Sequence, residues 1–347
     1  MNRAGKIALT PLSGLYGLVV DRRSALYERG VFRQHRVTAP VISVGNITVG
    51  GTGKTPLVEW IARTLAAEGH RPCVVTRGYH RNTKGRIVAS NGIDISATLH
   101  EAGEEAFMLA EALKGKAAVV CDSDRVAGAN WAIENLGSDV IVLDDGFQHR
   151  RIARDLDVVT IDATNPWGNG NLLPAGTLRE PLAALSRADC FVITRADDAV
   201  RTAALRDELR ELNAEAPIFT SVTNLSETRI LSINVSAPLE PKSHPIAAFC
   251  AIGNPESFFA LLKREGFQLK YQRPFGDHHR FNQTDLDKVE AAARNAGAEF
   301  LITTAKDAVK LLQLKFEMPC YVAEIAIEIV PSEEFRRLLT KTIESFK

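Results

Sequence analysis

The residues best suited to chemistry lie at positions 50–55, where the chain reads Gly-Gly-Thr-Gly-Lys-Thr. The last three match the end of the phosphate-binding pattern G-x-x-x-x-G-K-[ST], although Thr48 stands in place of its first glycine. Glycines let the backbone approach a phosphate closely, and N–H groups at the start of a following helix point at the anion. The simpler alternative is a glycine-rich turn between a strand and a helix.

This segment, residues 48–55, is called the phosphate loop below, and it predicts a P-loop phosphotransferase that uses ATP and Mg²⁺. Lys54 would reach the β- and γ-phosphates and take part in catalysis, while the Thr55 hydroxyl would bind Mg²⁺. The predicted ATP-binding residues are Thr48, Val49, Gly50, Gly51, Thr52, Gly53, Lys54 and Thr55.

A second candidate element is the apolar run at residues 140–143, which ends in Asp144 and Asp145. Mg²⁺ prefers oxygen ligands, and open α/β sheets bind their ligands beyond the carboxyl ends of the strands. Two aspartates after a strand are, on their own, more often a turn or a helix cap. Together with the phosphate loop they predict that Asp144 or Asp145 holds Mg²⁺, with Gln148 positioning a metal-bound water.

Two further groups of polar residues are ambiguous on the residues alone. Glu104 and Glu105 open a predicted helix, where acidic side chains suit the positive end of the helix dipole. Asp277, His278 and His279 are consecutive, and an ordinary hydrogen-bonded loop cluster would explain them as well as a catalytic role.

The elements that would position these residues are short apolar strands alternating with helices, a pattern typical of βαβ units and a parallel sheet. We therefore expect an α/β fold with a P-loop NTPase-like, mostly parallel sheet. The predicted strands are residues 40–45, 73–76, 117–121, 140–143, 156–161 and 190–193, and the predicted helices are residues 55–67, 104–113 and 125–136.

A change of pattern at residues 222–245, where Ser, Asn, Pro and Lys cluster, predicts a linker. A second, smaller α/β domain follows, with predicted strands at residues 246–252, 268–272, 300–303 and 321–325 and a final helix at 332–346. The predicted division is an N-terminal helical segment (1–36), a P-loop kinase domain (37–222), a linker (223–245) and a C-terminal α/β domain (246–347).

The N-terminal segment combines an uncharged apolar stretch at residues 7–20 with flanking basic residues. The stretch is shorter than the roughly 20 residues needed to span a bilayer, and no signal-peptide cleavage site follows it. Two interpretations remain: a helix lying in the membrane interface, which suits anionic lipid, or an ordinary helix packed on the core. The basic residues are Arg3, Lys6, Arg22, Arg23, Arg29, Arg33 and Arg36, against Asp21 and Glu28.

The bulk composition narrows the function classes. Lys+Arg and Asp+Glu are both 42 in 347 residues, so the basic footprint of a nucleic-acid-binding protein is missing. The five cysteines form no C-x-x-C pair, which argues against a zinc site or a disulfide framework and favours reduced thiols in the cytosol. No obligate protein partner is inferred.

The sequence resembles the tetraacyldisaccharide 4′-kinases of lipid A synthesis. The resemblance extends from about residue 9 to residue 312, and its most specific part is Asp-Asp-Gly-Phe-Gln-His following this phosphate loop. The segments that carry it are residues 40–56, 76–79, 143–149, 173–181, 253–255, 277–278 and 306–310. It implies transfer of the ATP γ-phosphoryl group to the 4′-hydroxyl of a tetraacyldisaccharide 1-phosphate, which forms the lipid IVA precursor of lipid A.

The resemblance also implies site residues and a location. It suggests an acid–histidine pair with one residue from each domain, in which Glu104 is the base and His278 orients it. The family has Asp at the position of Glu104, so the side chain here is one methylene longer. Contacts to phosphate, metal or disaccharide are further implied for Arg77, Tyr79, Arg179 and Glu180. The protein is expected at the cytoplasmic face of the bacterial inner membrane as a peripheral protein, since a tetraacyl lipid cannot leave the bilayer cheaply.

Two other functions compete with this interpretation. A P-loop ATPase or GTPase that acts as a membrane-associated switch would need no lipid acceptor, but a guanine-specific Asn-Lys-x-Asp run is absent from the chain. A cytosolic small-molecule kinase fits less well, because it would not need the uncharged N-terminal stretch.

Overall fold

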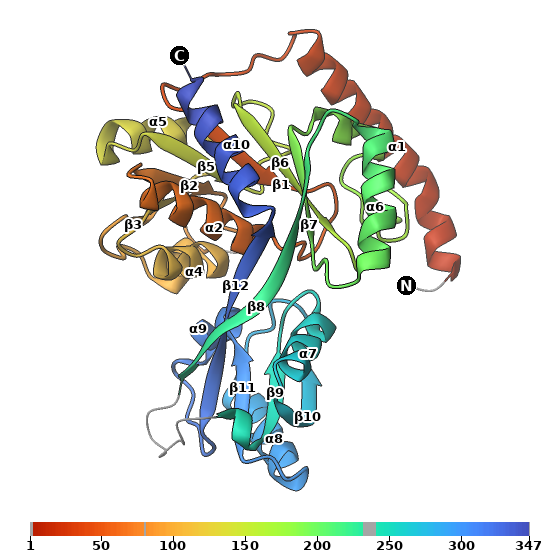
Figure 1. Cartoon of the computed structure of the whole chain (residues 1–347). Helices are drawn as coiled ribbons and strands as arrows, with labels where there is room; N and C mark the ends of the chain where they lie inside the picture. The colour runs from red at the N-terminus through yellow and green to blue at the C-terminus, as the bar shows by residue number, and fades with distance from the viewer. Residues whose placement is uncertain (1–2, 80, 232–240, 347) are drawn as a thin grey trace. The chain divides into compact units, whose positions relative to one another are not determined.

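The computed structural model describes residues 3–79, 81–231 and 241–346, with side chains from residue 9 onward (Figure 1). Two compact units share the chain. The first contains Met1–Val222 and Glu328–Lys347, and the second contains Thr223–Ile327. Each unit is an α/β structure built on parallel strands.

The sheet of the first unit has the strand order β7-β6-β1-β5-β2-β4-β3, and the start of β8 pairs with β7. All pairings are parallel except that of β3 with β4. Strands covered on both faces are apolar throughout, which explains their uninterrupted Val and Ile runs. The bounds are β1 Val41–Gly45, β2 Pro72–Thr76, β3 Ile87–Asn91, β4 Ala118–Cys121, β5 Val140–Asp144, β6 Leu156–Asp162, β7 Cys190–Thr194 and β8 Ile218–Ile230.

Helices cover this sheet, and local sequence signals set their ends. In α5, Asp124 caps the N-terminus by accepting hydrogen bonds from the N–H groups of Val126 and Ala127, and Gly137 ends the helix in the left-handed conformation. The remaining bounds are α1 Arg3–Glu28, α2 Lys54–Ala67, α3 Leu99–Ala102, α4 Glu104–Ala112, α5 Arg125–Leu136, η1 Leu182–Arg187, α6 Ala199–Leu212 and α10 Ser332–Glu344.

The second unit has the strand order β10-β9-β11-β12, with every pairing parallel. Helix α7 packs Phe258, Phe259 and Leu262 into one core, and α8 packs Leu286 and Val289 into another, so helices cover both faces. The bounds are η2 Pro241–Ser243, β9 Pro245–Cys250, α7 Pro255–Arg264, β10 Gln268–Pro274, α8 Gln283–Asn295, β11 Phe300–Thr304, α9 Ala305–Leu311 and β12 Cys320–Val330.

The domain boundaries differ from the sequence prediction in two places. Residues 223–230 of the expected linker 223–245 form the second part of β8, residues 232–240 lie outside the described part, and β9 already begins at Pro245. The last part of the expected C-terminal domain 246–347, Glu328–Lys347, belongs to the first unit. The reason is packing: Phe335 of α10 is fully buried, with its ring 4.9 Å from that of Phe219 and 5.6 Å from that of Trp60.

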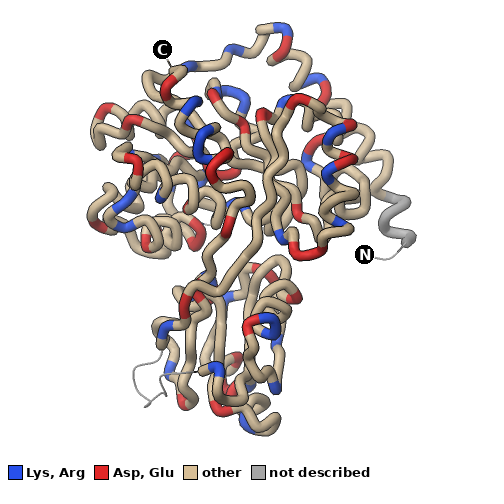
Figure 2. The backbone as a smooth tube through the Cα atoms, viewed as in Figure 1, with Lys and Arg blue, Asp and Glu red and all other residues tan. Residues whose placement is uncertain are grey.

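Helix α1 has two different faces. Ser13 and Gly17 are buried against the first unit, whereas Leu12, Leu15, Leu18 and Val19 are exposed. Figure 2 shows the middle of this helix without charged positions, and Arg22 and Arg23 follow this uncharged stretch in the sequence. Within the described residues, no helix has the length and apolar character that crossing a membrane requires.

The five cysteines are all buried and unpaired. They lie on strands at or near the sheet cores: Cys73, Cys121, Cys190, Cys250 and Cys320. Burial raises the pKa of the Cys73 thiol to about 12 and that of Cys121 to about 11, so these thiols stay protonated at neutral pH.

Candidate active site

The phosphate loop connects β1 to α2, as the sequence predicts. Gly50 (φ 120°) and Gly53 (φ 78°) adopt backbone conformations that favour glycine. Gly53 precedes the first residue of α2, and no side chain caps the helix start. The N–H groups of the first turn are therefore available to an anion, and the helix dipole favours one there.

Buried hydroxyls hold the loop in place before any ligand arrives. The Thr52 and Thr160 hydroxyl oxygens lie 3.0 Å apart, and Thr160 donates to the Gly45 carbonyl at 3.2 Å. Thr194, at the end of β7, donates to the Thr52 carbonyl at 3.0 Å. Residues of β6 and β7 thus hold Thr52 of the loop, and Thr160 also bonds to the end of β1.

Lys54 is held between two oxygen atoms at the start of α2. Its Nζ donates to Asn46 Oδ1 at 3.2 Å and lies 3.4 Å from Asp145 Oδ1. Asn46 is fully buried, and its amide also donates to the Thr48 carbonyl at 2.7 Å. Sequence reasoning did not assign Asn46 a role; a polar residue directly after a buried strand was the available signal.

Asp145 is at the centre of a charged network and has a positive φ of 53°. Arg179 Nη1 donates to its Oδ2 at 2.6 Å, while Lys54 approaches the other oxygen. Burial would raise the pKa of Asp145, but Lys54 and Arg179 outweigh it and lower the pKa below the ordinary value. Arg179, expected to contact phosphate or substrate, is therefore a partner of a predicted metal ligand.

Asp144 is the more buried of the two aspartates. Its Oδ2 accepts a hydrogen bond from the Thr76 hydroxyl at 3.0 Å. Burial, together with the charges of Glu105 and Asp145, raises the pKa of Asp144 to about 6. The excess of negative charge at this point is what a bound cation would relieve.

Gln148 and Glu180 are tied into the protein itself. Gln148 Nε2 donates to the Asn46 carbonyl at 2.8 Å and to Glu180 Oε1 at 2.9 Å. The other oxygen of Glu180 accepts from Arg187 at 2.8 Å, and Arg187 lies over the Phe147 ring. Glu180 is buried, with both oxygens engaged by side chains.

The start of α4 lies beside the loop after β2, where Gly103 is next to the Tyr79 backbone. Gly103 (φ 85°) precedes Glu104, and a Cβ at this position would lie 2.5 Å from the Tyr79 carbonyl oxygen. Arg77 and Tyr79 are exposed, and Glu104 is half-buried. The charge of the neighbouring Glu105 contributes to the raised pKa of Asp144.

His278 belongs to the second unit, on the loop between β10 and α8. It adopts a positive φ of 58°, and its N–H donates to Asp277 Oδ1 at 3.0 Å. Lys306 Nζ lies 2.9 Å from the same oxygen and 3.5 Å from His278 Nε2. Burial would raise the pKa of Asp277, but Lys306 and His278 lower it below the ordinary value.

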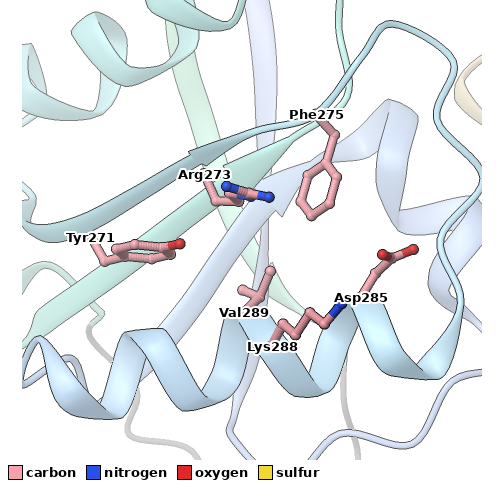
Figure 3. Close-up of a pocket in the computed structure, with 6 residues that line it drawn as sticks. All are labelled: Tyr271, Arg273, Phe275, Asp285, Lys288 and Val289. Carbon is pink, nitrogen blue, oxygen red and sulfur yellow. The ribbon is translucent and has the colours of Figure 1, made fainter.

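The second unit also contains a cavity of about 240 Å³ between the end of β10 and α8 (Figure 3). Phe275 stacks on His279, which pairs with Asp285 at 3.0 Å, so the cavity wall continues into the loop that carries His278. None of its lining residues is a predicted site residue: Tyr271, Arg273, Phe275, Asp285, Lys288 and Val289.

The chemistry of the donors near Lys54 fits Mg²⁺. Among the described residues no group of three or more His, Cys, Asp or Glu side chains is arranged to hold a metal ion. A P-loop magnesium site needs fewer, because one or two carboxylates, a hydroxyl and the nucleotide phosphates share the ion. Thr55, Asp144 and Asp145 supply hard oxygen atoms of that kind.

Comparison of the sequence with known protein families shows the family to which the chain belongs. A model of the tetraacyldisaccharide-1-P 4′-kinase family matches residues 5–344. The chain belongs to this family. The tetraacyldisaccharide 4′-kinase of Desulfotalea psychrophila is 39% identical over 347 residues, covering 97% of this chain and 96% of that protein. That of Geobacter metallireducens is 42% identical over 305 residues, covering 87% and 88%.

A solved member of the family has the same fold. The LpxK of Aquifex aeolicus, crystallised with ATP, superposes with a TM-score of 0.77 at 30% identity and covers 97% of this chain and 99% of that chain. The predicted P-loop NTPase-like α/β fold and the resemblance to the tetraacyldisaccharide 4′-kinases are therefore confirmed. Family membership favours a kinase over a P-loop switch without an acceptor.

Proposed function

We propose that the chain is an ATP-dependent tetraacyldisaccharide 4′-kinase, which transfers the γ-phosphoryl group to the 4′-hydroxyl of a tetraacyldisaccharide 1-phosphate. The observation that carries this function is the phosphate loop with Lys54 held at its end, in a chain that matches the family over residues 5–344. The lipid A precursor is then the product, and ADP leaves.

The phosphate loop would bind and align the nucleotide. Its glycines admit the phosphates, the uncapped N–H groups of α2 bind their oxygens, and Lys54 neutralises charge on the β- and γ-phosphates. Because buried hydroxyls fix the loop backbone, little reorganisation accompanies binding.

Thr55, Asp144 and Asp145 would hold Mg²⁺, and Gln148 would stabilise the neighbouring backbone through its hydrogen bonds. When bound, the ion offsets negative charge on the phosphoryl oxygens. Arg179 and Lys54 keep Asp145 ionised, which is the form a cation needs, and Thr76 orients Asp144. Gln148 donates hydrogen bonds to both the Asn46 carbonyl and the Glu180 carboxylate, and so joins the segment before the phosphate loop to residue 180.

Glu104 is the proposed base. Its carboxylate would accept the proton of the sugar hydroxyl as the new O–P bond forms and the bond from the γ-phosphorus to the bridging oxygen breaks. Arg77 and Tyr79, on the loop after β2, are proposed to contact phosphate or the disaccharide. His278, held by Asp277 and Lys306 in the second unit, is proposed as the second catalytic residue.

The exposed face of α1 is the proposed membrane contact, and the cytoplasmic face of the inner membrane is the proposed location. Leu12, Leu15, Leu18 and Val19 would enter the lipid interface, and the arginines beyond residue 21 would meet anionic headgroups. Exchanging Leu15 and Leu18 for Gln should reduce the partition constant for anionic vesicles, measured by sedimentation, by about thirtyfold, since each leucine contributes roughly 1 kcal/mol of apolar transfer. Val200→Gln, an exposed valine on α6, is the matched control.

One assay tests the function as a whole. The purified protein is incubated with γ-labelled ATP, MgCl₂ and a tetraacyldisaccharide 1-phosphate in mixed micelles, and lipid-soluble label is measured. Label in a lipid bisphosphate supports the kinase. Release of inorganic phosphate without labelled lipid would instead support the ATPase switch.

A further inference from the structure

The side of α1 that is turned away from solvent contacts the segment that supports the phosphate loop. Ser13 Oγ donates to the Leu172 carbonyl at 3.0 Å and accepts from the Ala175 N–H at 2.9 Å. A Cβ on Gly17 would lie 2.9 Å from a methyl carbon of Leu172, so the helix sits directly on residues 171–180, called the support segment below.

The support segment is in turn hydrogen-bonded to the phosphate-binding region. The Val49 N–H donates to the Thr177 carbonyl at 2.7 Å, and the Arg179 N–H donates to the Ile47 carbonyl at 2.7 Å. Thr48 and Leu178 form an antiparallel bridge between these hydrogen bonds. The backbone just before Gly50 is thus a short ladder with the support segment.

Tyr16 of α1 reaches the charged part of this arrangement. The Tyr16 hydroxyl donates to the Arg179 carbonyl at 2.9 Å. Arg179 pairs with Asp145 at 2.6 Å, and Asp145 lies 3.4 Å from Lys54 Nζ. Burial and the charge of Glu180 raise the pKa of Tyr16, so the hydroxyl keeps the proton that it donates.

We propose that Tyr16 is a positioning residue of the nucleotide site, which acts through Arg179 and Asp145 on Lys54. The inference rests on the proposed ATP-binding function of the phosphate loop. It makes α1 a helix with two roles, because its exposed face is the proposed lipid contact and its packed face orients the phosphate-binding lysine.

Tyr16→Phe tests this inference, because it removes one hydroxyl and keeps the ring. Losing a neutral hydrogen bond of this kind weakens an interaction by about threefold to tenfold. We therefore expect the dissociation constant for a fluorescent ATP analogue with MgCl₂ to rise by about that factor, with a melting temperature close to that of the wild type. This readout needs no lipid acceptor, so it remains valid even if the proposed kinase activity is wrong.

Tyr27→Phe is the matched control on the same helix. The Tyr27 ring contacts Phe32 and two guanidinium groups, but within the described residues its hydroxyl makes no hydrogen bond. Analogue affinity should be unchanged in this variant. Equal affinities of the Tyr16→Phe variant and the wild type would overturn the proposal, and so would equal losses in the Tyr16→Phe and Tyr27→Phe variants.

A double-mutant cycle identifies the route. If Tyr16 acts through Arg179, the Tyr16→Phe change should add little to the loss caused by Arg179→Lys. Additive losses would mean that the hydroxyl does not act through Arg179, and the proposal would fail. Ser13→Ala offers a second way to loosen the packed face, with the same expected direction in analogue affinity.

Discussion

Lys54 in the first unit and His278 in the second are both predicted catalytic residues, but the protein holds them in different ways. The Lys54 ammonium group lies between the Asn46 side-chain amide and the Asp145 carboxylate, and each of these is fixed by a further hydrogen bond. His278 lies on a loop with a positive φ, beside one exposed ion pair between Asp277 and Lys306. The phosphate site is therefore pre-organised by several linked side chains of the first unit, whereas the contacts described for His278 come from Asp277 on its own loop and from Lys306.

The strongest test of this difference is Lys54→Ala. Removing the central cation of a pre-organised site should lower kcat/KM by about 10²–10³-fold, because no water or side chain replaces its charge at the phosphates. Label transfer to the lipid acceptor measures the effect, and circular dichroism checks folding. Lys114→Ala removes an exposed lysine from the turn that follows α4 and should have near wild-type activity. Near-native turnover of the Lys54→Ala variant would reject the phosphate-loop assignment.

Glu104→Gln separates proton transfer from nucleotide binding. The change removes the basic oxygen but keeps the shape, so kcat should fall by about 10²-fold while the KM for ATP stays similar. Glu111→Gln on the exposed side of the same helix is the control. An unchanged kcat would move the base role to another carboxylate, with Asp122 and Asp124 as the next candidates.

Substitutions of the two adjacent histidines in the second unit are expected to affect different properties, activity for His278 and stability for His279. His278→Asn should lower kcat by about tenfold, the lower end of acid–base effects, with little change in melting temperature. His279→Asn should lower the melting temperature instead, since His279 stacks on Phe275 and pairs with Asp285. The comparison between the two regions fails if His278→Asn affects only stability.

The smallest effect concerns stability and pH. The pKa of Asp144 is raised from 3.8 to about 6 in the folded protein, so its ionised form disfavours folding above that pH. At about 1.4 kcal/mol per pKa unit, Asp144→Asn should increase the free energy of unfolding by about 1–3 kcal/mol at pH 7. The gain should shrink as the pH falls from about 6 to 4. Urea unfolding across this range measures it.

Asp145→Asn is the matched control for the sign of that effect. Burial would raise the pKa of Asp145, but Lys54 and Arg179 lower it below the ordinary value. The ionised Asp145 carboxylate therefore stabilises the fold at pH values above its pKa in the unfolded chain. The substitution should destabilise the protein at pH 7, and the difference should disappear at low pH. The same sign for both variants would contradict the electrostatic description of the site.

Much of the fold could be predicted because the elements that carry it have strong local signals. Helix α5 has the expected bounds, since an N-cap Asp124 and a C-terminal Gly137 fix them. The short central strands are apolar throughout and differ from expectation by about one residue. Strand β3 and the full length of β8 were missed, because β3 is partly exposed and β8 is mixed in polarity along its length.

The site could be predicted as residue types but not as contacts. The pattern around Lys54 indicated phosphate binding, yet nothing local indicates that Asn46 fixes its amine or that Arg179 pairs with Asp145. Those contacts join residues that are 8 and 34 positions apart, and only folding brings the distant pair together. The return of α10 to the first unit has the same origin, because it depends on where Phe335 finds an apolar surface.

The burial of all five cysteines has a practical consequence for spectroscopy. Protonated, inaccessible thiols react slowly with maleimide or methanethiosulfonate reagents. A single cysteine introduced at Leu15 or Leu18 would therefore accept a nitroxide or a fluorophore with little background, and no native cysteine would have to be replaced. The depth of such a probe in a bilayer, measured by collisional quenching, would report directly on which side of α1 meets lipid.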